Sequence, residues 1–481
     1  MSVKDFNKIY WKSIAELASD VQAGKISAVD LVNKSLNAIE NAKEYGAILF
    51  VAKDDALRRA KKIDALVAKG EKVGKLAGVP FILKDNFLTR DVETTAASNI
   101  LKGFIPPYQS TAVTKLEAEG AIMVAKANLD SFAHGSSTEN SDFGVTKNPH
   151  DKERVPGGSS GGPAAAVALG LAPFSLGTDT GGSIRLPASY TGTVGLKPTY
   201  GLVSRFGVVA MASSTDVIGP ITETVEDSAL ILDVMSGRDE HDSTTIERSP
   251  DSYTDLKLGL KGLKVGVIKQ HMGEGLDPLV KKSINKTVDR LRVSGAIVKE
   301  ISIPSLDLSL ACYYIIQPAE VSSNLGRYDG VRFGYSEQKA KTVDDVYDLS
   351  RSYGFNSENK RRIMVGTYVL SSGYYDAYYK KAQTVRTLLI NQFNEAFKEV
   401  DVLVGPTAPS VAFKIGENVK DPLKMYLSDI MTVGVNLVGV PAISVPVDEV
   451  KGLPVGFQII APQKADRLVL ALGTKIEALR Q

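Results

Sequence analysis

The stretch that decides the fold runs from Val155 to Tyr200 and reads VPGGSSGGPAAAVALGLAPFSLGTDTGGSIRLPASYTGTVGLKPTY. Serines stand among paired glycines at two places in it, GGSSGG at 157–162 and DTGGS at 179–183. Glycine removes the side chain that would keep peptide N–H groups away from a ligand. A serine hydroxyl in such a loop can act as a nucleophile, with nearby N–H groups as an oxyanion hole. We therefore interpret the stretch as catalytic.

Two other interpretations of these glycines fit less well. A flexible linker is not expected, because apolar runs at 164–171 and 174–176 separate the glycine clusters. A phosphate-binding loop has the spacing of Gly157 and Gly162, but it requires a lysine where Pro163 stands. The segment thus favours nucleophilic catalysis.

A serine nucleophile needs a base, and the sequence offers Lys84 in GVPFILKDNF. The four histidines of the chain fall in no recognisable Ser/His/Asp motif. Residues 81–83 are apolar and predict a short buried strand that Lys84 closes. Burial disfavours the ammonium form and can bring a lysine pKa from ~10.4 down toward neutrality, where a neutral amine can act as a base. An average lysine at the end of a strand is solvated. Lys84 alone does not decide between a solvated lysine and a buried base.

The motifs KDN at 84–86, GGSSGG and DTGGSIRLPA at 179–188, taken as a set, resemble the amidase signature family over nearly the whole chain. The resemblance implies a Ser–cis-Ser–Lys triad in which Ser183 is the nucleophile, Ser159 the bridge and Lys84 the base. It also implies a cis peptide bond between Gly158 and Ser159. The oxyanion hole would consist of the N–H groups of Thr180, Gly181, Gly182 and Ser183.

Segments at 137–162, 365–389, 404–413 and 421–447 are similar to family members that hydrolyse glutamine within a multi-subunit amidotransferase. The resemblance implies that Arg362 binds the α-carboxylate of glutamine and that Asp429 binds its α-amino group. A guanidinium suits a carboxylate because it binds bidentately. The sequence does not separate Arg362 from Arg361, and arginines in a KRR run usually lie on a solvated helix face.

The same resemblance implies two partners, the amidotransferase subunits B and C. The first would use ATP and Mg²⁺, together with the ammonia released at Ser183, to convert Glu-tRNA(Gln) to Gln-tRNA(Gln), and the second, a small protein, would complete the complex. This chain itself would need no cofactor and no metal, and its sequence contains no Walker motif and no polybasic tract. A stand-alone amidase acting on another small amide is the alternative. A non-catalytic scaffold is disfavoured by the intact Lys84, Ser159 and Ser183.

Two positions depart from the usual family pattern. Pro163 follows GGSSGG where a serine is common, and it suits the first turn of the helix expected after Gly162. His134, in AHGSSTEN, stands where a methionine is usual. It would line the substrate pocket and could affect affinity or pH dependence, although a tolerated lining residue is the simpler interpretation. We also expect Asp179 and Arg185 to pair and brace the nucleophile loop.

Strands and helices alternate along the chain. We expect helices over 28–42, 54–67 and 112–119 and from Pro278, and strands at 47–51, 81–83, 265–268, 402–404, 443–447 and 455–460. This order predicts an α/β fold of one domain over 1–481, with a large mixed twisted sheet sandwiched between helices as in the family. The signature region would span about 134–235, and tyrosine-rich residues 310–385 would form a cap-like subregion.

Composition narrows the class of protein. The 481 residues are 43% hydrophobic and 23% charged, and a net charge of +2 implies no strong field for nucleic acid. The single cysteine, Cys312, excludes an internal disulfide and any zinc site with several cysteines. No stretch reaches ~18 apolar residues, so no membrane span is expected, and the charged N-terminal stretch does not resemble a secretory signal. We therefore expect a cytoplasmic enzyme.

Overall fold

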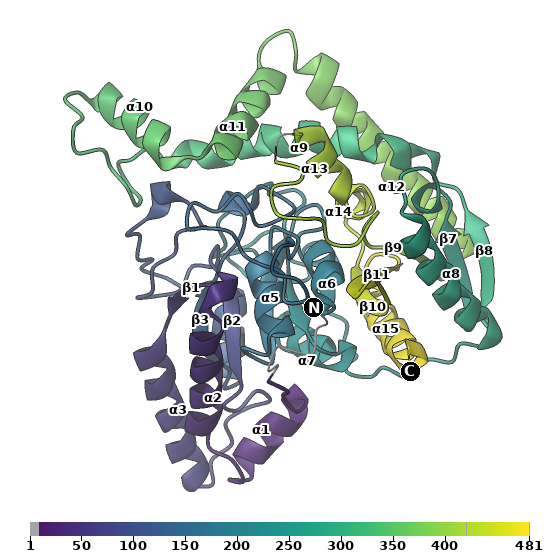
Figure 1. Ribbon diagram of the computed structural model, residues 1–481, viewed down its shortest axis with the longest axis horizontal. Coiled ribbons are helices and arrows are strands. Elements are labelled where there is room, and N and C mark those ends of the chain that lie inside the picture. The colour runs from purple at the N-terminus through teal and green to yellow at the C-terminus, as the bar shows by residue number, and fades with distance from the viewer. Residues whose placement is uncertain (1–8, 420, 481) are drawn as a thin grey trace.

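An eleven-stranded mixed sheet forms the centre of the computed structural model, which describes residues 9–419 and 421–480 (Figure 1). The strand order is β1-β3-β2-β4-β6-β5-β10-β11-β9-β7-β8. β2 is parallel to β3 and β4, and β7 is parallel to β8 and β9, whereas the other neighbours are antiparallel. The predicted large mixed sheet of an α/β fold is confirmed.

The strands are β1 (Ile48–Val51), β2 (Pro80–Lys84), β3 (Ile122–Ala127), β4 (Phe174–Asp179), β5 (Val194–Lys197), β6 (Val217–Thr222), β7 (Lys264–Ile268), β8 (Ile297–Ile301), β9 (Val402–Pro406), β10 (Ala442–Val450) and β11 (Leu453–Ile460). The α-helices are α1 (Ile14–Gln22), α2 (Ala28–Asn41), α3 (Lys53–Ala68), α4 (Thr111–Ala118), α5 (Gly161–Ala168), α6 (Arg185–Thr191), α7 (Val225–Met235), α8 (Pro278–Val293), α9 (Ser309–Asn324), α10 (Val343–Gly354), α11 (Ser357–Leu370), α12 (Lys381–Glu399), α13 (Pro422–Tyr426), α14 (Val433–Val438) and α15 (Asp466–Arg480). Every helix and strand expected from the sequence is present, with ends shifted by at most three residues.

Local signals set the helix boundaries. Ser27 precedes α2 and accepts a hydrogen bond from the N–H of Asp30, and Asp277 caps α8, with Pro278 at its first position. The described part of the chain has no helix long and apolar enough to cross a membrane. The first eight residues of the N-terminal stretch, in which no secretory signal was recognised, lie outside the described residues.

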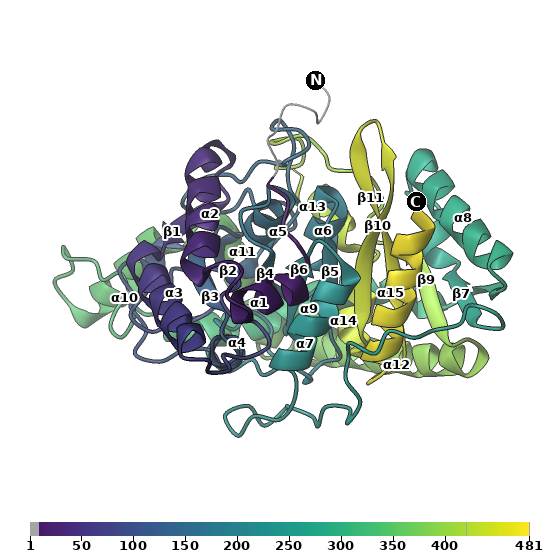
Figure 2. The same ribbon diagram turned by 90° about the horizontal axis from the view of Figure 1, so that it is seen from below.

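The central strands are covered on both faces. Every residue of β2, β4, β6 and β9 is buried, which requires packing on each side of the sheet. Helix α5 packs on β2, β4 and β6, while α15 packs on β10 and β11 (Figure 2). Between β2 and β4 the rings of Phe81 and Phe174 stack with their centroids 5.2 Å apart.

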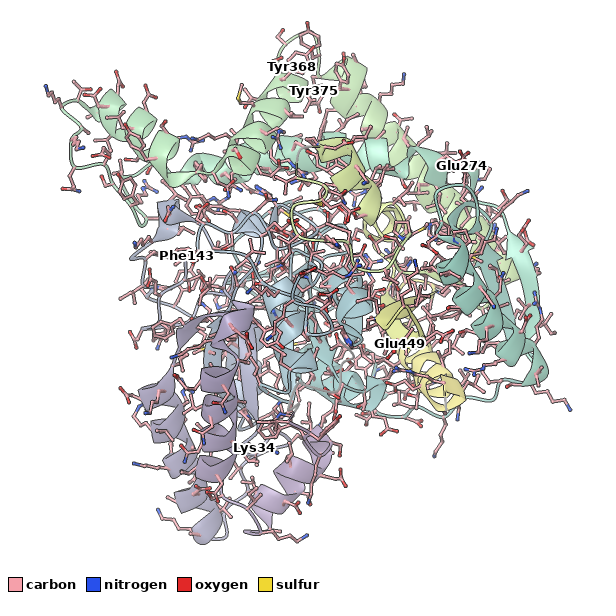
Figure 3. The ribbon with its side chains drawn as sticks, viewed as in Figure 1. Lys34, Phe143, Glu274, Tyr368, Tyr375 and Glu449 are labelled. Atoms are coloured by element: carbon pink, nitrogen blue, oxygen red, sulfur yellow. The ribbon has the colours of Figure 1, made fainter. Side chains whose placement is uncertain are left out.

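A helical layer, defined here as residues 309–399, runs along one side of the molecule and contains α9 to α12 (Figure 1). Helix α9 packs against both α11 and α12. Exposed tyrosines, Tyr368 and Tyr375 among them, gather where α11 leads into α12 (Figure 3). The cap-like subregion predicted for 310–385 lies inside this layer, and its independence from the rest of the chain stays a prediction.

The register of β2 fixes the position of Lys84. Leu83 lies opposite Leu176 in the parallel pair of β2 and β4, so Lys84 and the end of β4 share one edge of the sheet. The carboxyl ends of parallel strands are where α/β folds place their binding sites. The loop that carries DTGGS leaves β4 at this edge.

Candidate active site

Lys84 is fully buried, and its Nζ contacts three hydroxyl groups. It lies 2.7 Å from Ser159 Oγ, 2.9 Å from Ser160 Oγ and 2.9 Å from Thr178 Oγ1. Burial lowers the pKa of Lys84 to about 7, although the nearby carboxylates, Asp130 first among them, favour the ammonium form. Lys84 is thus no solvated strand-end lysine, and a neutral amine is available near neutral pH.

The neighbouring hydroxyl groups orient this amine. Ser160 Oγ donates to the carbonyl of Thr178 at 3.1 Å, so toward Lys84 it presents a lone pair. Thr178 Oγ1 also accepts a hydrogen bond, at 3.1 Å, from the amide of Asn86. A neutral amine has two N–H groups and one lone pair. When the N–H groups point to Ser160 and Thr178, the lone pair faces Ser159.

The GGSSGG loop places Ser159 beside the lysine. The peptide bond between Gly158 and Ser159 is cis, as the family resemblance implied. Position 158 needs glycine because a Cβ there would collide with a carboxylate oxygen of Asp130. The N–H of Ser160 donates to the carbonyl of Ser183 at 3.1 Å and so joins the two glycine-rich loops.

Ser183 lies in the loop between β4 and α6, and 8% of it is exposed. Its hydroxyl makes no hydrogen bond to any described residue, Ser159 included. The loops of the two serines are adjacent, so the structure brings Ser183 to the site while leaving its hydroxyl available.

The four N–H groups predicted for the oxyanion hole divide into two kinds. The N–H of Gly182 donates to Asp179 Oδ1 at 2.8 Å and anchors the loop. The N–H groups of Thr180, Gly181 and Ser183 have no partner within the described residues. Three donors are therefore free to meet a ligand oxygen, while the fourth holds the loop that carries them.

Asp179 and Arg185 form the brace that the sequence led us to expect. Arg185 Nε and Nη2 each lie 3.0 Å from a carboxylate oxygen of Asp179, and both side chains are fully buried. Burial on its own would raise the pKa of Asp179, but the guanidinium holds it far below its ordinary value. Asp179 also accepts from the N–H of Ile184 at 3.2 Å, so the charge pair defines the course of the nucleophile loop.

The structure separates the two neighbouring arginines on α11. Arg362 is 4% exposed, and its guanidinium packs against the stacked rings of Tyr314 and Tyr426, 4.7 and 4.8 Å from their centroids. The Arg361 side chain is 46% exposed. The solvated-face interpretation is therefore right for Arg361 and wrong for Arg362. Both arginines pair with Glu358.

Asp429 lies at the end of a short 3-10 helix, η9 (Leu427–Asp429), and is buried. Its Oδ2 accepts hydrogen bonds from the hydroxyl of Tyr314 at 3.0 Å and from Ser136 Oγ at 3.3 Å. Burial raises the pKa of Asp429 to about 7. Tyr314 connects the two charged residues, because its ring packs on Arg362 and its hydroxyl bonds to Asp429.

Thr432 ties this charged pair to the nucleophile loop. Its N–H donates to the carbonyl of Asp429 at 2.9 Å, and its Oγ1 donates to the carbonyl of Gly181 at 2.6 Å. The ring of Tyr313 covers Gly181, where a Cβ would lie 2.7 Å from it. Residues of the sheet edge and of the helical layer thus form one site.

Sequence reasoning missed Thr178, Tyr314 and Thr432. Thr178 could have been found from β4, because a polar residue in a strand buried on both sides needs a partner. Tyr314 lies in an apolar stretch of α9 that reads as core. Thr432 follows Asp429 by one helical turn and carries no signal of its own.

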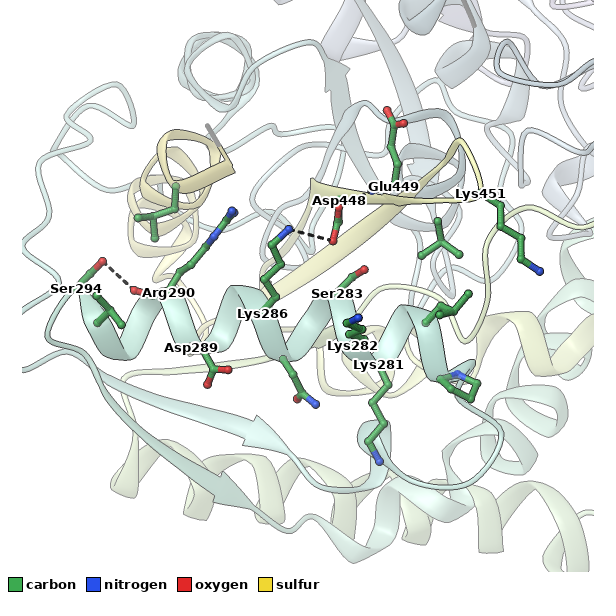
Figure 4. A pocket seen from close by; sticks show the side chains of 16 residues that line it. Lys281, Lys282, Ser283, Lys286, Asp289, Arg290, Ser294, Asp448, Glu449 and Lys451 are labelled. Carbon is green, nitrogen blue, oxygen red and sulfur yellow. Dashed lines mark hydrogen bonds and ion pairs between the residues drawn. The ribbon is translucent and has the colours of Figure 1, made fainter. Parts of the chain in front are cut away.

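A hollow elsewhere in the described part of the chain has a different lining. A hollow between α8 and the β10–β11 turn is lined by residues such as Lys286 and Asp448, and it contains none of the predicted site residues (Figure 4). Among the described residues, no group of three or more His, Cys, Asp or Glu side chains could hold a metal ion.

The amidase family model matches residues 30–470. The chain belongs to the amidase family. The resemblance inferred from the signature motifs is therefore confirmed. The A subunit of the glutamyl-tRNA(Gln) amidotransferase of Staphylococcus haemolyticus is 50% identical to this amidase over 454 residues, which cover 94% of each chain.

Solved structures extend the comparison. The crystal structure of the glutamyl-tRNA(Gln) amidotransferase A subunit from Thermotoga maritima is 42% identical to this amidase, covers 92% of it with 90% of its own chain, and gives a TM-score of 0.78. A bacterial aryl acylamidase of the amidase signature family is 27% identical, covers 98% of this chain with 96% of its own, and gives a TM-score of 0.86. Amidases of different names thus share the fold, and the substrate has to be argued from the site residues.

Gly182→Ala is expected to destabilise this amidase by about 1–3 kcal/mol. The backbone at Gly182 has a φ of +132°, and a Cβ there would collide with the Thr432 hydroxyl. Urea unfolding followed by circular dichroism measures the loss. Gly24→Ala is the matched control, because Gly24 also has a positive φ, +67°, but has no atom within 4 Å of the added Cβ. Equal losses in the two variants would contradict a close fit between the nucleophile loop and Thr432.

Proposed function

We propose that this amidase is the glutamine-hydrolysing subunit of a glutamyl-tRNA(Gln) amidotransferase. The observation that carries the proposal is the buried pair of Arg362 and Asp429, connected by Tyr314, beside the loop of Ser183. Such a pair complements a free amino acid, because the guanidinium takes the α-carboxylate and the carboxylate takes the α-ammonium group. The high identity to proteins named as the A subunit of this amidotransferase, over nearly the whole chain, supports the same substrate.

In the proposed reaction Ser183 Oγ attacks the side-chain amide carbon of glutamine. The Ser183 proton passes to Ser159 as the Ser159 proton passes to the neutral amine of Lys84. The amide oxygen becomes an oxyanion, which the free N–H groups of Thr180, Gly181 and Ser183 stabilise. Arg362 and Asp429 hold the other end of the substrate and so align the amide with the nucleophile.

The proton then returns from Lys84 through Ser159 to the leaving nitrogen, which departs as ammonia. A water molecule hydrolyses the glutamyl ester of Ser183 by the same proton path, and the products are glutamate and ammonia. No ATP enters these steps. We assign ATP and Mg²⁺ to the first of the two partner subunits B and C, which would consume the ammonia in converting Glu-tRNA(Gln) to Gln-tRNA(Gln). This activity places the complex in the cytoplasm, where tRNA is charged.

Ser183→Ala is expected to lower glutamine-dependent transamidation by more than about a thousandfold, because the nucleophile is lost. Ammonia-dependent transamidation by the same complex should persist, because ammonia then bypasses the site. Both rates are measured on the complex with subunits B and C, with Ser160→Ala assayed in parallel to show what loss of a neighbouring hydroxyl does. Loss of both activities in a correctly assembled Ser183→Ala complex would contradict the assignment.

The kcat for glutamine hydrolysis is expected to rise with pH through about 7, the pKa of buried Lys84. Below this pH the ammonium form cannot accept a proton, so kcat should fall about tenfold for each further pH unit. The measurement uses saturating glutamine, because the substrate ammonium then keeps Asp429 ionised and removes its titration from the profile. A flat kcat between about pH 5.5 and 8.5 would exclude Lys84 as the base.

Arg362→Lys is expected to raise the KM for glutamine by about ten- to a hundredfold, since an ammonium cannot replace the bidentate contact. Arg361→Lys is the matched control and should leave KM unchanged, because the Arg361 side chain is 46% exposed. Steady-state glutaminase assays with the partner subunits measure both. Equal effects of the two substitutions, or equal use of amides that lack an α-carboxylate, would favour a stand-alone amidase.

A further inference from the structure

Three hydrogen-bond donors in and around Arg362 have no acceptor among the described residues. His134 Nε2 and Gln317 Nε2 are buried without a partner. Arg362 uses Nε and Nη1 for its two hydrogen bonds, and its Nη2 donates to no described residue. His134 is 0% exposed and Gln317 is 1% exposed, so these donors are not hydrated by bulk solvent. Unpaired buried donors are costly and call for an explanation.

The tautomer of His134 follows from its neighbours. Asn359 Nδ2 donates to the carbonyl of Ser131 at 3.1 Å, which fixes the orientation of the Asn359 amide. The same Nδ2 lies 2.8 Å from His134 Nδ1, so Nδ1 has to be the acceptor. Burial, with a smaller effect of the Arg362 charge, lowers the pKa of His134 well below its ordinary value and keeps the ring neutral. The one proton of the neutral ring is therefore on Nε2.

The orientation of Gln317 is fixed in the same way. Its Oε1 lies 2.7 Å from Nη1 of Arg362, which can only donate. The other end of the amide, Nε2, is then a donor by necessity. Gln317 lies on α9, whereas His134 lies in the loop that precedes GGSSGG, so the two donors reach the arginine from different parts of the chain.

These contacts hold both side chains against α11. Asn359, which holds His134, and Arg362, which holds Gln317, are one turn apart on α11. Glu358 is the one carboxylate paired with the guanidinium in the described residues, and it occupies Nε. An anion that bridged these side chains would meet a cation and two neutral N–H donors at once.

We propose that His134 and Gln317 determine substrate specificity by donating hydrogen bonds to the α-carboxylate of the amino acid that Arg362 binds. The inference rests on the proposed glutamine hydrolysis and extends it. It adds His134 and Gln317, which belong neither to the triad nor to the pair of Arg362 and Asp429, to the groups that bind the substrate carboxylate. A carboxylate has about four lone-pair sites and can accept from all three residues. An amide substrate without a carboxylate leaves these donors unpaired. A site with buried donors strongly rejects a substrate analogue that lacks the group they would bind.

Gln317→Glu provides the sharpest test. The substitution keeps an oxygen acceptor for Arg362 and the size of the side chain, but it replaces the free N–H donor with a second oxygen. A structural role of Gln317 would be preserved, whereas a carboxylate ligand would now be repelled. We expect the KM for L-glutamine to rise by about a hundredfold, with kcat changed less than about twofold. An unchanged KM overturns the proposal for Gln317.

His134→Met tests the second donor. Loss of one hydrogen bond to a charged group should raise the KM for glutamine by about tenfold or more. His271→Met is the matched control, because His271 is also buried and its two ring nitrogens have no partner among the described residues, but it lies in a separate 3-10 helix, η5 (Gln270–Met272), beside Gly405. Equal KM values for wild type and His134→Met overturn the proposal for His134. Thermal unfolding of each variant shows whether it is folded.

A binding experiment separates this inference from the proposed function. Calorimetric titration of the full chain with Ser183→Ala uses L-glutamine and 4-aminobutanamide, which lacks the α-carboxylate. We expect glutamine to bind at least about tenfold more tightly, and Gln317→Glu in this background to abolish the difference. Preferential binding of glutamine that Gln317→Glu abolishes, without turnover by the wild-type complex, would contradict the proposed function and uphold the inference. Equal binding of the two compounds would overturn the inference whatever the turnover.

Discussion

The rest of the site depends on keeping the amine of Lys84 uncharged. Its position at the end of β2, between two parallel strands buried on both faces, removes the water that would stabilise an ammonium ion. The carboxylate of Asp179 is close enough to favour the charged form. Its charge is balanced by Arg185, which binds it through two nitrogens, so the ion pair braces the nucleophile loop and also limits the field at the lysine. Asp130 is buried nearby, and burial raises its pKa to about 7, so near neutral pH it carries less charge than a fully ionised carboxylate and favours the ammonium form of Lys84 less.

The chemistry and the recognition of substrate come from different parts of the fold. Lys84, Ser159 and Ser183 lie at the edge of the sheet, on segments held by backbone hydrogen bonds and by glycines that no larger residue could replace. Arg362 and Tyr314 come from α11 and α9 of the helical layer. Thr432 joins the two parts, because it contacts Asp429 on one side and Gly181 on the other. A fold arranged in this way can keep its triad while the helices that bind the substrate change. This agrees with the presence of the fold in amidases of different names.

Features set by local sequence could be predicted, and those set by tertiary contacts could not. The glycine loops indicated a hydroxyl-rich catalytic loop, and the apolar run indicated a buried strand that ends at Lys84, because backbone freedom and burial both restrict residue choice. The run alone left the burial of the Lys84 amine open. Strand β6 was not predicted, because its sequence, VIGPIT, contains both glycine and proline. Strand β8 was not predicted, because it is an edge strand with exposed charges. Arg361 and Arg362 could not be separated, since adjacent residues on a helix face different sides and the burying partner is supplied by α9. The hydrogen bond from the N–H of Gly182 to Asp179 could not be predicted either, because it depends on the position of the Asp179 side chain.

Unpaired donors around Arg362 support the inference that this site binds an anion. Lys126 is a deeply buried charge whose hydrogen-bonding needs are met, because it pairs with Asp85 at 2.8 Å and also contacts the carbonyl of Phe87 at 2.9 Å. Around Arg362, by contrast, the described residues offer no acceptor to His134 Nε2, Gln317 Nε2 or Arg362 Nη2. Apolar residues at His134 and Gln317 would leave no such donor unpaired, but they would also remove the acceptors that Asn359 and Arg362 use. The cost of leaving these groups unpaired is recovered when an anion binds, and an anion that can accept from all of them is held by its shape as well as by its charge. Selection for a carboxylate beside an amide therefore explains why polar side chains occupy positions that the core would otherwise fill with apolar ones.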